Sequence, residues 1–453
     1  MKDLKGRHIV VAGAARSGVA AAILLKKKGA FPFVTDSGKI NPSSHERLTE
    51  SGIEFEENQH SAKAFEGDFL VVSPGVPTST SIVQHYLTTN RAVFSEIELA
   101  SWFNESPTVA VTGSNGKTTV ANWLAHTWKL SGREYILGGN IGTAFTEQVE
   151  ETMAHKTALL EISSFQLDHI DSFRPNISIL LNITGDHLDR YNHNFTQYAS
   201  SKLKITSNQT SSDWFIYNFD DPIISEHVLE LSNTSDSPKI LAFSSSKEVP
   251  KGAFIRNGNL ILKLNNEEEY LMQIGEIGLS GTHNLQNGMA TALAARASEI
   301  KNEFIRESLK SFEGVAHRLE FVREYKGIKY INDSKATNVN AVWYALDSFN
   351  TPMVLILGGR DKGNDYSLLN QQIREKVHTI VAIGEARELI KKQLKDVVPN
   401  FIEAKSLKDA VKQSRNVAKR GEIVLMSPAC SSFDMFDNYE HRGNEFKQAV
   451  LDL

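Results

Sequence analysis

The sequence predicts an α/β protein built from three parallel sheets. Short apolar runs alternate with helical patterns along the whole chain of 453 residues, which is typical of parallel sheets. Several of these runs end in glycine-rich or polar loops, and ligands of open α/β sheets bind at that end of the strands. A chain of this length accommodates about three domains.

Composition excludes several classes of protein. The formal charge is −5, which argues against a general nucleic-acid binder because phosphate backbones select basic faces. No apolar run approaches the roughly 18 residues needed to span a bilayer, and the polar start Met1–His8 does not resemble a secretory signal. The single cysteine, Cys430, excludes internal disulfides. We therefore expect a cytoplasmic protein with neither nucleic acid nor membrane as partner.

The first block, residues 1–95, begins with a predicted strand at His8–Ala12 and a helix that ends near Lys28. The turn between them, Gly13 to Gly18, is similar to a dinucleotide fingerprint, but Ala15 replaces the glycine that lets the backbone approach a pyrophosphate. A second strand, Phe31–Thr35, ends at Asp36, the usual position of a ribose-binding acid. The residues leave open a loose diphosphate site or a tight turn without a ligand.

A third strand of this block, Phe69–Val72, is followed by the stiff loop Ser73-Pro74-Gly75-Val76-Pro77. This loop is expected at the same edge of the sheet as the Gly13–Gly18 turn. It is either a second ligand-binding loop or scaffold only.

The second block, residues 96–314, contains the strongest motif. The predicted strand Thr108–Thr112 runs directly into Gly113-Ser114-Asn115-Gly116-Lys117-Thr118-Thr119. A glycine-rich turn at a helix start directs backbone N–H groups and partial positive charge at one point. Lys117 can reach the β- and γ-phosphates of a nucleotide, and the hydroxyl of Thr118 can hold Mg²⁺. The motif predicts a nucleoside triphosphate site, although Val111 stands where the usual pattern has its first glycine.

Carboxylates and a histidine follow the next strands of this block, which we predict at Thr157–Leu160, Ile177–Leu181 and Trp214–Tyr217. Glu161 comes directly after the first, and Asp186 and His187 follow the second. Two neighbouring strands that both end in ligand-type residues favour a metal site beside the phosphate loop. The alternative is that Ser163 or Ser164 caps a helix and Glu161 is merely exposed.

Two helical segments of the block carry further polar side chains. Lys202 lies on the predicted helix Gln197–Ile205, where the residues alone favour a solvated surface charge. Asn284 and Asn287 lie one turn apart on the predicted helix His283–Ala297. They hold a base or a phosphate, or they cap that helix.

The third block, residues 315–453, has polar loops after consecutive strands, and His317-Arg318 opens it. The strands are predicted near Lys329–Ile331, Met353–Leu357, Thr379–Ile383 and Ile423–Met426. The loops are Asn332–Asn338, Gly358–Gly363 and Ser427–Asp434. Lysines and an arginine at consecutive strand ends predict capture of anionic groups. The fold prediction is thus a Rossmann-like N-terminal domain, a central P-loop ATPase-like domain and a C-terminal Rossmann-like domain.

In this order, the motifs closely resemble those of the Mur ligases of bacterial cell-wall synthesis, and within that family the branch that adds D-glutamate. The stretches that carry the resemblance to this branch are Glu161–Leu167, Thr184–Tyr191, Ile331–Asn338 and Ser427–Phe446, and the likeness spans the whole chain. The resemblance implies ATP-dependent ligation of D-glutamate to UDP-N-acetylmuramoyl-L-alanine through an acyl phosphate. That reaction belongs to peptidoglycan precursor synthesis and so to cell shape and division.

The resemblance also implies roles for individual residues. Thr118 and Glu161 would hold a first Mg²⁺, and His187 with a carbamate on Lys202 would hold a second, which reverses the surface interpretation of Lys202. Lys117, Glu161, His187 and Lys202 would be the catalytic group. The implied ATP contacts are Gly113, Ser114, Asn115, Gly116, Lys117, Thr118, Thr119, Asn287, Arg318 and Asp333. The implied nucleotide-sugar contacts are Arg16, Ser17, Asp36, Ser37, Ser73, Pro74, Gly75, Asn140 and Ser163. The implied D-glutamate contacts are Lys335, Thr337, Lys362, Ser432 and Tyr439.

Three alternatives remain open: a sibling amino-acid or folate polyglutamate-type ligase, an oxidoreductase based on Gly13–Gly18, and a UDP-sugar sensor with an inactive phosphate loop. Ala15 disfavours the second, and the intact Lys117, Thr118, Glu161 and His187 disfavour the third. We expect a monomer. Because the implied ATP and D-glutamate contacts belong to different domains, we also expect the third domain to close as a rigid body.

Overall fold

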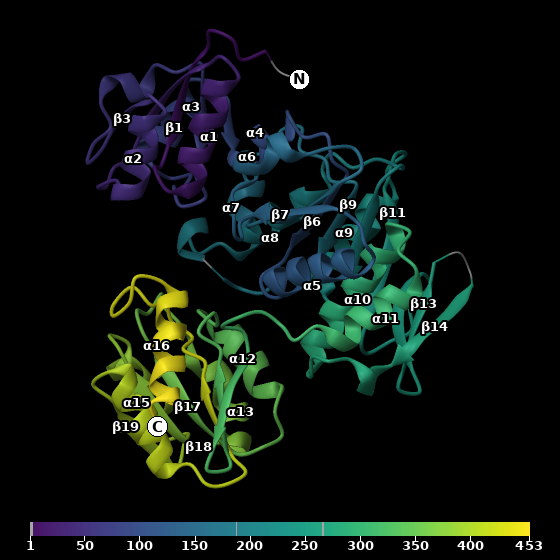
Figure 1. Ribbon diagram of the computed structural model, residues 1–453, viewed down its shortest axis with the longest axis vertical. Coiled ribbons are helices and arrows are strands. Elements are labelled where there is room, and N and C mark those ends of the chain that lie inside the picture. Colours follow the sequence, from purple (N-terminus) through teal and green to yellow (C-terminus); the bar gives the residue numbers. More distant parts are fainter. Residues whose placement is uncertain (1–2, 187, 265–266) are drawn as a thin grey trace. The chain divides into compact units, whose positions relative to one another are not determined.

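The computed structural model describes residues 3–186, 188–264 and 267–453, and within these ranges the strands form three sheets (Figure 1). The chain divides into two compact units. One comprises Met1–Ile277 with Gln286–Ser311, and the other Gly278–Leu285 with Phe312–Leu453. The first unit contains two sheets and the second unit contains one, which confirms the α/β class. The boundaries predicted after residues 95 and 314 stay predictions. No helix in the described ranges is long and apolar enough to cross a membrane.

The first sheet is parallel throughout, and its described strands have the order β3-β2-β1-β4-β5. Its strands are β1 (His8–Ala12), β2 (Phe31–Thr35), β3 (Glu54–Glu56), β4 (Phe69–Val72) and β5 (Val93–Ser95). Its helices are α1 (Arg16–Lys27), α2 (Pro42–Glu50) and α3 (Ser81–Thr88), and α4 (Glu96–Ser101) follows directly. Because β1 pairs with β2 on one side and β4 on the other, the loops after β1 and β4 are neighbours.

Two glycines of the first turn have structural reasons of their own. Gly13 has φ of +91°, and a Cβ there would lie 2.9 Å from Val76 Cγ2. A Cβ on Gly18 would lie 1.8 Å from the carbonyl oxygen of Gly13, so only glycine lets α1 start this close to the end of β1. The Ser73 hydroxyl donates to the same carbonyl oxygen at 2.9 Å and fixes the loop after β4 against the turn.

The second sheet has the order β14-β13-β12-β11-β10-β9-β6-β8-β7 among its described strands. These are β6 (Thr108–Thr112), β7 (Tyr135–Gly139), β8 (Thr157–Glu161), β9 (Ile177–Leu180), β10 (Trp214–Asn218), β11 (Lys239–Ser244), β12 (Gly252–Arg256), β13 (Asn259–Lys263) and β14 (Glu268–Gln273). The accompanying helices are α5 (Lys117–Leu130), α6 (Phe145–Gln148), α7 (Ser164–Leu167), α8 (Phe195–Leu203), α9 (Pro222–Ser232), α10 (Thr282–Ala297) and α11 (Asn302–Ser311). Strand β6 lies between β9 and β8, so the loops after these three strands meet at one edge.

The second and third sheets also contain antiparallel pairs, which the alternation of strands and helices in the sequence does not indicate. Strands β12, β13 and β14 form an antiparallel ribbon, and β15 (Glu320–Tyr325) pairs antiparallel with β16 (Ile328–Asn332) in the third sheet. Two of these pairs, β12–β13 and β15–β16, are joined by a two-residue turn. Asn257 and Gly258 have φ of 52° and 74°, and Lys326 and Gly327 have φ of 53° and 77°. Two successive positive φ values are typical of the hairpin turn that matches strand twist.

The two sheets of the first unit share one apolar core. A single buried cluster includes Val11 and Leu25 from the first sheet and its helix, together with Phe145 and Leu160 from the second. Salt bridges at the surface also connect them, among them Arg47 Nη2 to Glu147 Oε1 at 2.8 Å. Because the core is continuous, the loops of the two sheets hold defined positions relative to each other within this unit.

The third sheet has the order β15-β16-β20-β17-β18-β19 among its described strands. Its further strands are β17 (Met353–Gly358), β18 (Val377–Ile383), β19 (Asn400–Glu403) and β20 (Ile423–Met426). Its helices are α12 (Val339–Asp347), α13 (Asn370–Lys376), α14 (Arg387–Leu394), α15 (Leu407–Val417) and α16 (Tyr439–Leu451). Since β20 lies between β16 and β17, the polar loops that follow these three strands are neighbours.

Candidate functional site

The phosphate-binding loop lies at the carboxyl end of β6 and ends in α5. Gly116 precedes α5 in the left-handed region, with φ of +90°, and a Cβ there would lie 2.6 Å from Asn287 Oδ1. Asn287 therefore packs against the loop, on the side from which α10 approaches. Lys117 Nζ donates to the carbonyl oxygens of Gly113 and Ser114 at 2.8 and 2.9 Å. Its ammonium thus lies over the loop, where the phosphates of a nucleotide would bind.

Thr118 and Glu161 meet at the mouth of this loop. The Thr118 hydroxyl donates to Glu161 Oε2 at 2.7 Å, and Asn140 Nδ2 donates to Glu161 Oε1 at 3.0 Å. Glu161 is buried, so the alternative in which it is merely exposed is wrong. Ser163 does cap α7, in a reciprocal pair with Gln166, as that alternative proposed. A hydroxyl and a carboxylate oxygen side by side are a donor set that suits Mg²⁺.

Lys202 is buried beside the loop, with 2% of its surface exposed, so its interpretation as a solvated surface charge is wrong. Its Nζ donates to the Gly113 carbonyl oxygen at 2.8 Å and lies 4.7 Å from the centre of the Tyr198 ring. Burial, and then the charge of Lys117, lower the pKa of Lys202 well below its usual value. His187, the other predicted ligand of the second metal, lies outside the described residues.

Sequence reasoning missed two residues that hold this loop in place. Asn182, two residues after the end of β9, accepts from Asn115 N at 2.8 Å and donates to Asn115 O at 3.1 Å. Tyr198 OH lies 2.8 Å from Ser114 Oγ. Tyr198 precedes Lys202 by four residues on α8, so both side chains lie on one face of the helix. This spacing is the sequence signal that could have identified Tyr198.

The predicted nucleotide-sugar contacts gather at the first sheet. Asp36 accepts from Ala14 N at 2.7 Å and from Gly38 N at 2.9 Å, so its carboxylate fixes the turn after β1. Arg16 and Ser17 begin α1, and Arg16 and Ser37 are exposed. Ser73, Pro74 and Gly75 follow β4 at the neighbouring strand end. Asn140 and Ser163 instead follow β7 and β8 of the second sheet, where Asn140 contacts Glu161 and Ser163 caps α7.

In the second unit, Asp333 follows β16 and is fully buried. It accepts from Ser427 Oγ at 2.7 Å and from Leu319 N at 3.2 Å, and Arg318 Nη1 lies 3.9 Å from its Oδ1. Burial raises the pKa of Asp333 to about 6, although Arg318 opposes the shift. Arg318 and Asp333, both predicted ATP contacts, are therefore brought together.

The predicted D-glutamate contacts lie at the same sheet edge of the second unit. Lys335 Nζ donates to Tyr439 OH at 2.9 Å and lies 4.5 Å from the centre of that ring. Ser432 is buried, Thr337 is half-buried and Lys362 is exposed. The loops of Arg360 and Ser431 are joined by two backbone hydrogen bonds, at 2.9 and 3.2 Å. Several cationic and hydroxyl groups at one edge suit an anionic ligand.

Arg442 is a further residue that the sequence did not single out. It is fully buried and donates to Ser334 Oγ, Ser334 O and Cys430 O. Burial lowers the pKa of Arg442 to about 10. Its three hydrogen bonds connect α16 to the loops after β16 and β20. Arg442 therefore holds in place the two loops that carry Lys335 and Ser432.

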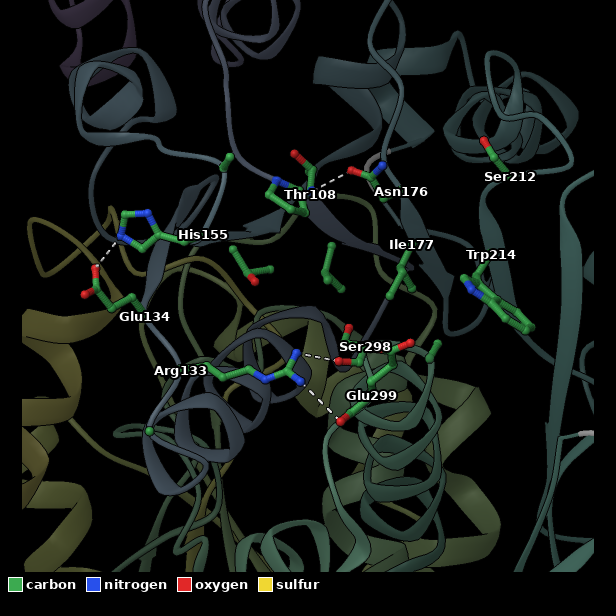
Figure 2. A pocket seen from close by; sticks show the side chains of 16 residues that line it. Thr108, Arg133, Glu134, His155, Asn176, Ile177, Ser212, Trp214, Ser298 and Glu299 are labelled. Atoms are coloured by element: carbon green, nitrogen blue, oxygen red, sulfur yellow. Dashed lines mark hydrogen bonds and ion pairs between the residues drawn. The ribbon is translucent and has the colours of Figure 1, made fainter.

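A separate cavity of about 680 Å³ opens at the other end of the second sheet (Figure 2). Thr108, Thr157, Ile177 and Trp214, the first residues of β6, β8, β9 and β10, line it. None of the predicted site residues that the structure describes lies in its wall. The carboxyl ends of the strands, and not this cavity, therefore form the candidate site.

Three segments of the chain match known protein families, and full-length relatives are also found. Residues 9–82 match the family described as "MurD N-terminal domain", residues 111–295 match "Mur ligase middle domain", and residues 317–430 match "Mur ligase, glutamate ligase domain". A UDP-N-acetylmuramoylalanine–D-glutamate ligase of Salinibacter ruber is 45% identical over 100% of this chain and 99% of its own length. One of Porphyromonas gingivalis is 44% identical over 98% of each chain.

Solved structures support the fold. A MurF ligase from Thermotoga maritima in complex with ADP superposes with a TM-score of 0.61 at 15% identity, covering 100% of both chains. A UDP-N-acetylmuramate–alanine ligase from Thermotoga maritima reaches 0.59 at 17% identity, over 98% of this chain and 99% of its own. At these identities the likeness concerns the fold alone.

Proposed function

The chain belongs to the Mur ligase family, and we propose that it joins D-glutamate to UDP-N-acetylmuramoyl-L-alanine with hydrolysis of ATP. The observation that carries the chemistry is the meeting of four side chains around one loop: Lys117 and Lys202 both donate to Gly113 O, and Thr118 bonds to Glu161. Full-length relatives with this activity in their names support the choice of substrates.

The proposed reaction has two steps. The substrate carboxylate first attacks the γ-phosphorus of ATP, and the β–γ bridging oxygen leaves with ADP. The amine of D-glutamate then attacks the acyl phosphate, loses a proton, and expels inorganic phosphate as the amide forms. Lys117 would stabilise the negative charge that develops on the transferring phosphoryl group. Electrostatic stabilisation of this kind is usually the largest single contribution of a protein to such a step.

The residues present fit the divalent ions that the family implies. Thr118 Oγ1 and Glu161 Oε2 are both hard oxygens, and they are already 2.7 Å apart. Mg²⁺ held there supplies charge neutralisation for the phosphates. His187 and a modified Lys202 would hold a second ion nearer the substrate carboxylate.

The buried environment of Lys202 supports a modification of its side chain. An ammonium cannot bind a cation, whereas a carbamate offers two oxygens. Burial, and then the charge of Lys117, lower the pKa of Lys202, and carbamate formation joins the amine nitrogen to the carbon of CO₂ with loss of one proton. We therefore propose a carbamate on Lys202 as part of the working enzyme.

We assign each part of the substrates to one of the predicted groups of contact residues. Arg16, Ser17, Asp36, Ser37 and the loop Ser73–Gly75 are proposed for the uridine diphosphate. Asn140 and Ser163 are proposed for the acyl part, and Lys335, Thr337, Lys362, Ser432 and Tyr439 for D-glutamate. We further propose a monomer that acts in the bacterial cytoplasm, where ATP is available.

Phosphate release from ATP tests the function. UDP-N-acetylmuramoyl-L-alanine is supplied with D-glutamate, L-glutamate, L-alanine, L-lysine or meso-diaminopimelate separately, and Lys117→Ala is the control. Release with D-glutamate alone, lost in the control, is the expected result. Release with another amino acid would identify a sibling ligase. No release, with UDP-sugar binding retained, would favour the sensor.

A further inference from the structure

Arg190 connects the two sheets of the first unit at their ligand-binding edges. It lies in the turn Leu188–Tyr191, after β9 of the second sheet. Its Nη1 donates to Gly75 O and its Nη2 to Pro74 O, both at 3.2 Å. Those two carbonyl oxygens belong to the loop after β4 of the first sheet. One half-buried side chain therefore joins the proposed nucleotide-sugar loop to the segment that carries His187.

The other face of the guanidinium is held by the short helix that follows Glu161. Its central carbon lies 4.2 Å from the centre of the Phe165 ring, within the range of a cation–π contact. Phe165 is stacked on Tyr191 with ring centres 5.9 Å apart, and Tyr191 OH donates to Asp168 at 2.8 Å. The position of Arg190 is thus fixed by α7, which begins three residues after the proposed metal ligand.

Phe165, Tyr191 and Tyr198 form an aromatic cluster that continues to Lys202. Tyr191 packs edge-on against Tyr198 at 5.5 Å, and Lys202 Nζ lies 4.7 Å from the Tyr198 ring centre. Tyr191 OH also contacts Ser201, the residue before Lys202, at 3.3 Å. A displacement of Arg190 would therefore shift this aromatic cluster and, through it, the groups proposed to surround the reacting carboxylate.

The contacts of Arg190 serve geometry more than charge. Within the described part of the chain, its hydrogen bonds go to main-chain carbonyl oxygens and none goes to a carboxylate. Two parallel N–H groups on successive carbonyl oxygens restrict both the distance and the direction of the loop. Lysine, with a single rotatable ammonium, cannot impose the same restriction.

We propose that Arg190 is a positioning residue that couples nucleotide binding at the loop Ser73–Gly75 to placement of the substrate carboxylate at the second sheet. The inference rests on the proposed function. Its physical basis is that binding energy from a remote part of a substrate can be used to orient the reacting part. A misplacement of about 1 Å costs on the order of 10²-fold in rate.

Arg190→Met tests the coupling, because methionine keeps an apolar stem against Phe165 and removes the guanidinium. We would compare kcat/KM for two substrates. One is the complete UDP-N-acetylmuramoyl-L-alanine, and the other is N-acetylmuramoyl-L-alanine 1-phosphate, which lacks the uridine nucleotide. We expect the complete substrate to lose about 10- to 100-fold and the truncated one to lose less than about 3-fold. The higher kcat/KM that the uridine nucleotide gives the complete substrate would then largely disappear. Arg190→Lys should restore a part of it.

A second measurement separates positioning from damage to the binding site. Calorimetry with UDP alone should give a Kd within about 3-fold of the wild-type value, while kcat at saturating substrate falls about 10-fold or more. Arg47→Met is the matched control, because Arg47 also joins the two sheets, through an ion pair with Glu147. It should leave the substrate ratio unchanged.

Equal losses for both substrates, or a UDP affinity that falls in parallel with kcat, would overturn the coupling and leave a structural role. These outcomes differ from failure of the proposed function itself. In that case the wild-type protein would release no phosphate with D-glutamate and the complete substrate.

Discussion

Lys202 shows at the scale of one residue how burial changes chemistry. Its Nζ is enclosed by Gly113 O and the Tyr198 ring, and its lowered pKa follows from that enclosure. If the neutral amine captures CO₂, protein equilibrated with ¹³C-bicarbonate should show a carbamate carbon signal by NMR. The signal should be missing in Lys202→Arg, which cannot form a carbamate. A wild-type spectrum without the signal, from enzyme that is active, would argue against the modification.

Asp333 should make the stability of the second unit depend on pH. Its folded-state pKa of about 6 lies above the ordinary value of about 3.9, so the folded protein binds this proton more tightly than the unfolded chain. The contribution of protonated Asp333 to stability is fully present below about pH 4 and is lost as pH rises through about 6. At pH 8 the buried charge costs about 2–3 kcal/mol.

Asp333→Asn should therefore raise the unfolding temperature at pH 8, and the gain should shrink toward pH 4, when both proteins are followed by thermal melts across that range. Asp396→Asn, at an exposed position, is the control. A gain that does not vary with pH would contradict the linkage. Activity should fall in the same variant, because Asp333 is a proposed ATP contact.

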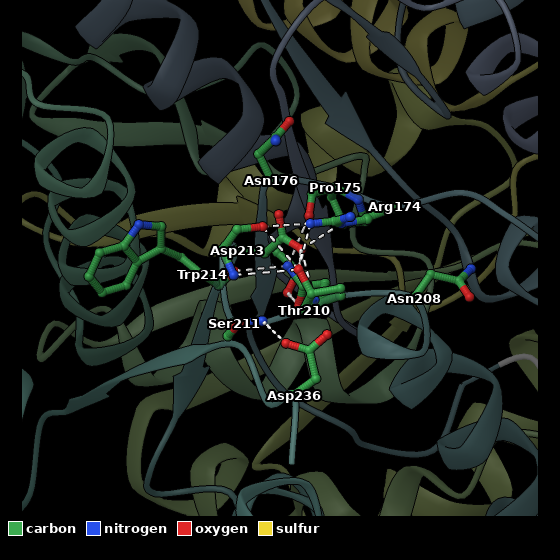
Figure 3. Close-up of polar contacts among 12 residues, drawn as sticks. Arg174, Pro175, Asn176, Asn208, Thr210, Ser211, Asp213, Trp214 and Asp236 are labelled. Carbon is green, nitrogen blue, oxygen red and sulfur yellow. Dashed lines mark hydrogen bonds and ion pairs between the residues drawn. The ribbon is translucent and has the colours of Figure 1, made fainter. Parts of the chain in front are cut away.

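At the scale of elements, the loops before β9 and β10 are tied by one buried carboxylate (Figure 3). Asp213 is 1% exposed as a side chain and accepts from Arg174 Nε at 2.7 Å and Thr210 N at 2.8 Å. Arg174 Nη2 also donates to the Thr210 and Ser212 hydroxyls. Removing the Asp213 carboxylate takes away the acceptor shared by Arg174 Nε and Thr210 N.

Asp213→Ala should consequently lower the free energy of unfolding by about 2–4 kcal/mol in denaturant titrations. The folded fraction should keep its catalytic rate, because this network lies at the end of the sheet away from the phosphate loop. Asp236→Ala is the control: Asp236 accepts from Ser211 N in the same loop but is exposed, so little should change. Equal effects of the two substitutions would show that burial of Asp213 is unimportant.

Sequence patterns identified the strands that run into glycine-rich loops, such as β1 and β6, because a buried run followed by such a turn is a local signal. The β12–β13 hairpin was missed, although Asn257-Gly258 is a local signal for its turn. The burial of Lys202 was different in kind. It depends on Gly113, 89 positions away in the chain, so no local pattern carries it, and only the family resemblance indicated it.

The contacts of Arg190 also lie beyond local reasoning. They run from the turn after β9 to a loop 115 positions earlier. Thr184–Tyr191 was recognised as a motif for its metal-ligand residues, and the neighbouring arginine carried no signal of its own. Packing of two sheets into one core brings these loops together, and a sequence pattern predicts each sheet separately.

At the scale of the whole molecule, the proposed ATP contacts come from both compact units: Lys117, Thr118 and Asn287 from the first, Arg318 and Asp333 from the second. Closure of the third domain as a rigid body stays a prediction. X-ray scattering should show a smaller radius of gyration when a non-hydrolysable ATP analogue, Mg²⁺ and UDP-N-acetylmuramoyl-L-alanine are added together.

The size of the compaction should depend on groups in both units, since a ligand shifts a conformational equilibrium only through different contacts in the two states. Lys117→Ala and Arg318→Ala should each reduce it at a fixed ligand concentration, whereas Arg47→Met should not. If the full ligand set left the scattering curve unchanged while calorimetry showed that nucleotide was bound, rigid-body closure would be wrong. The proposed ATP contacts of the second unit would then need reassignment, because one nucleotide could be bound without them.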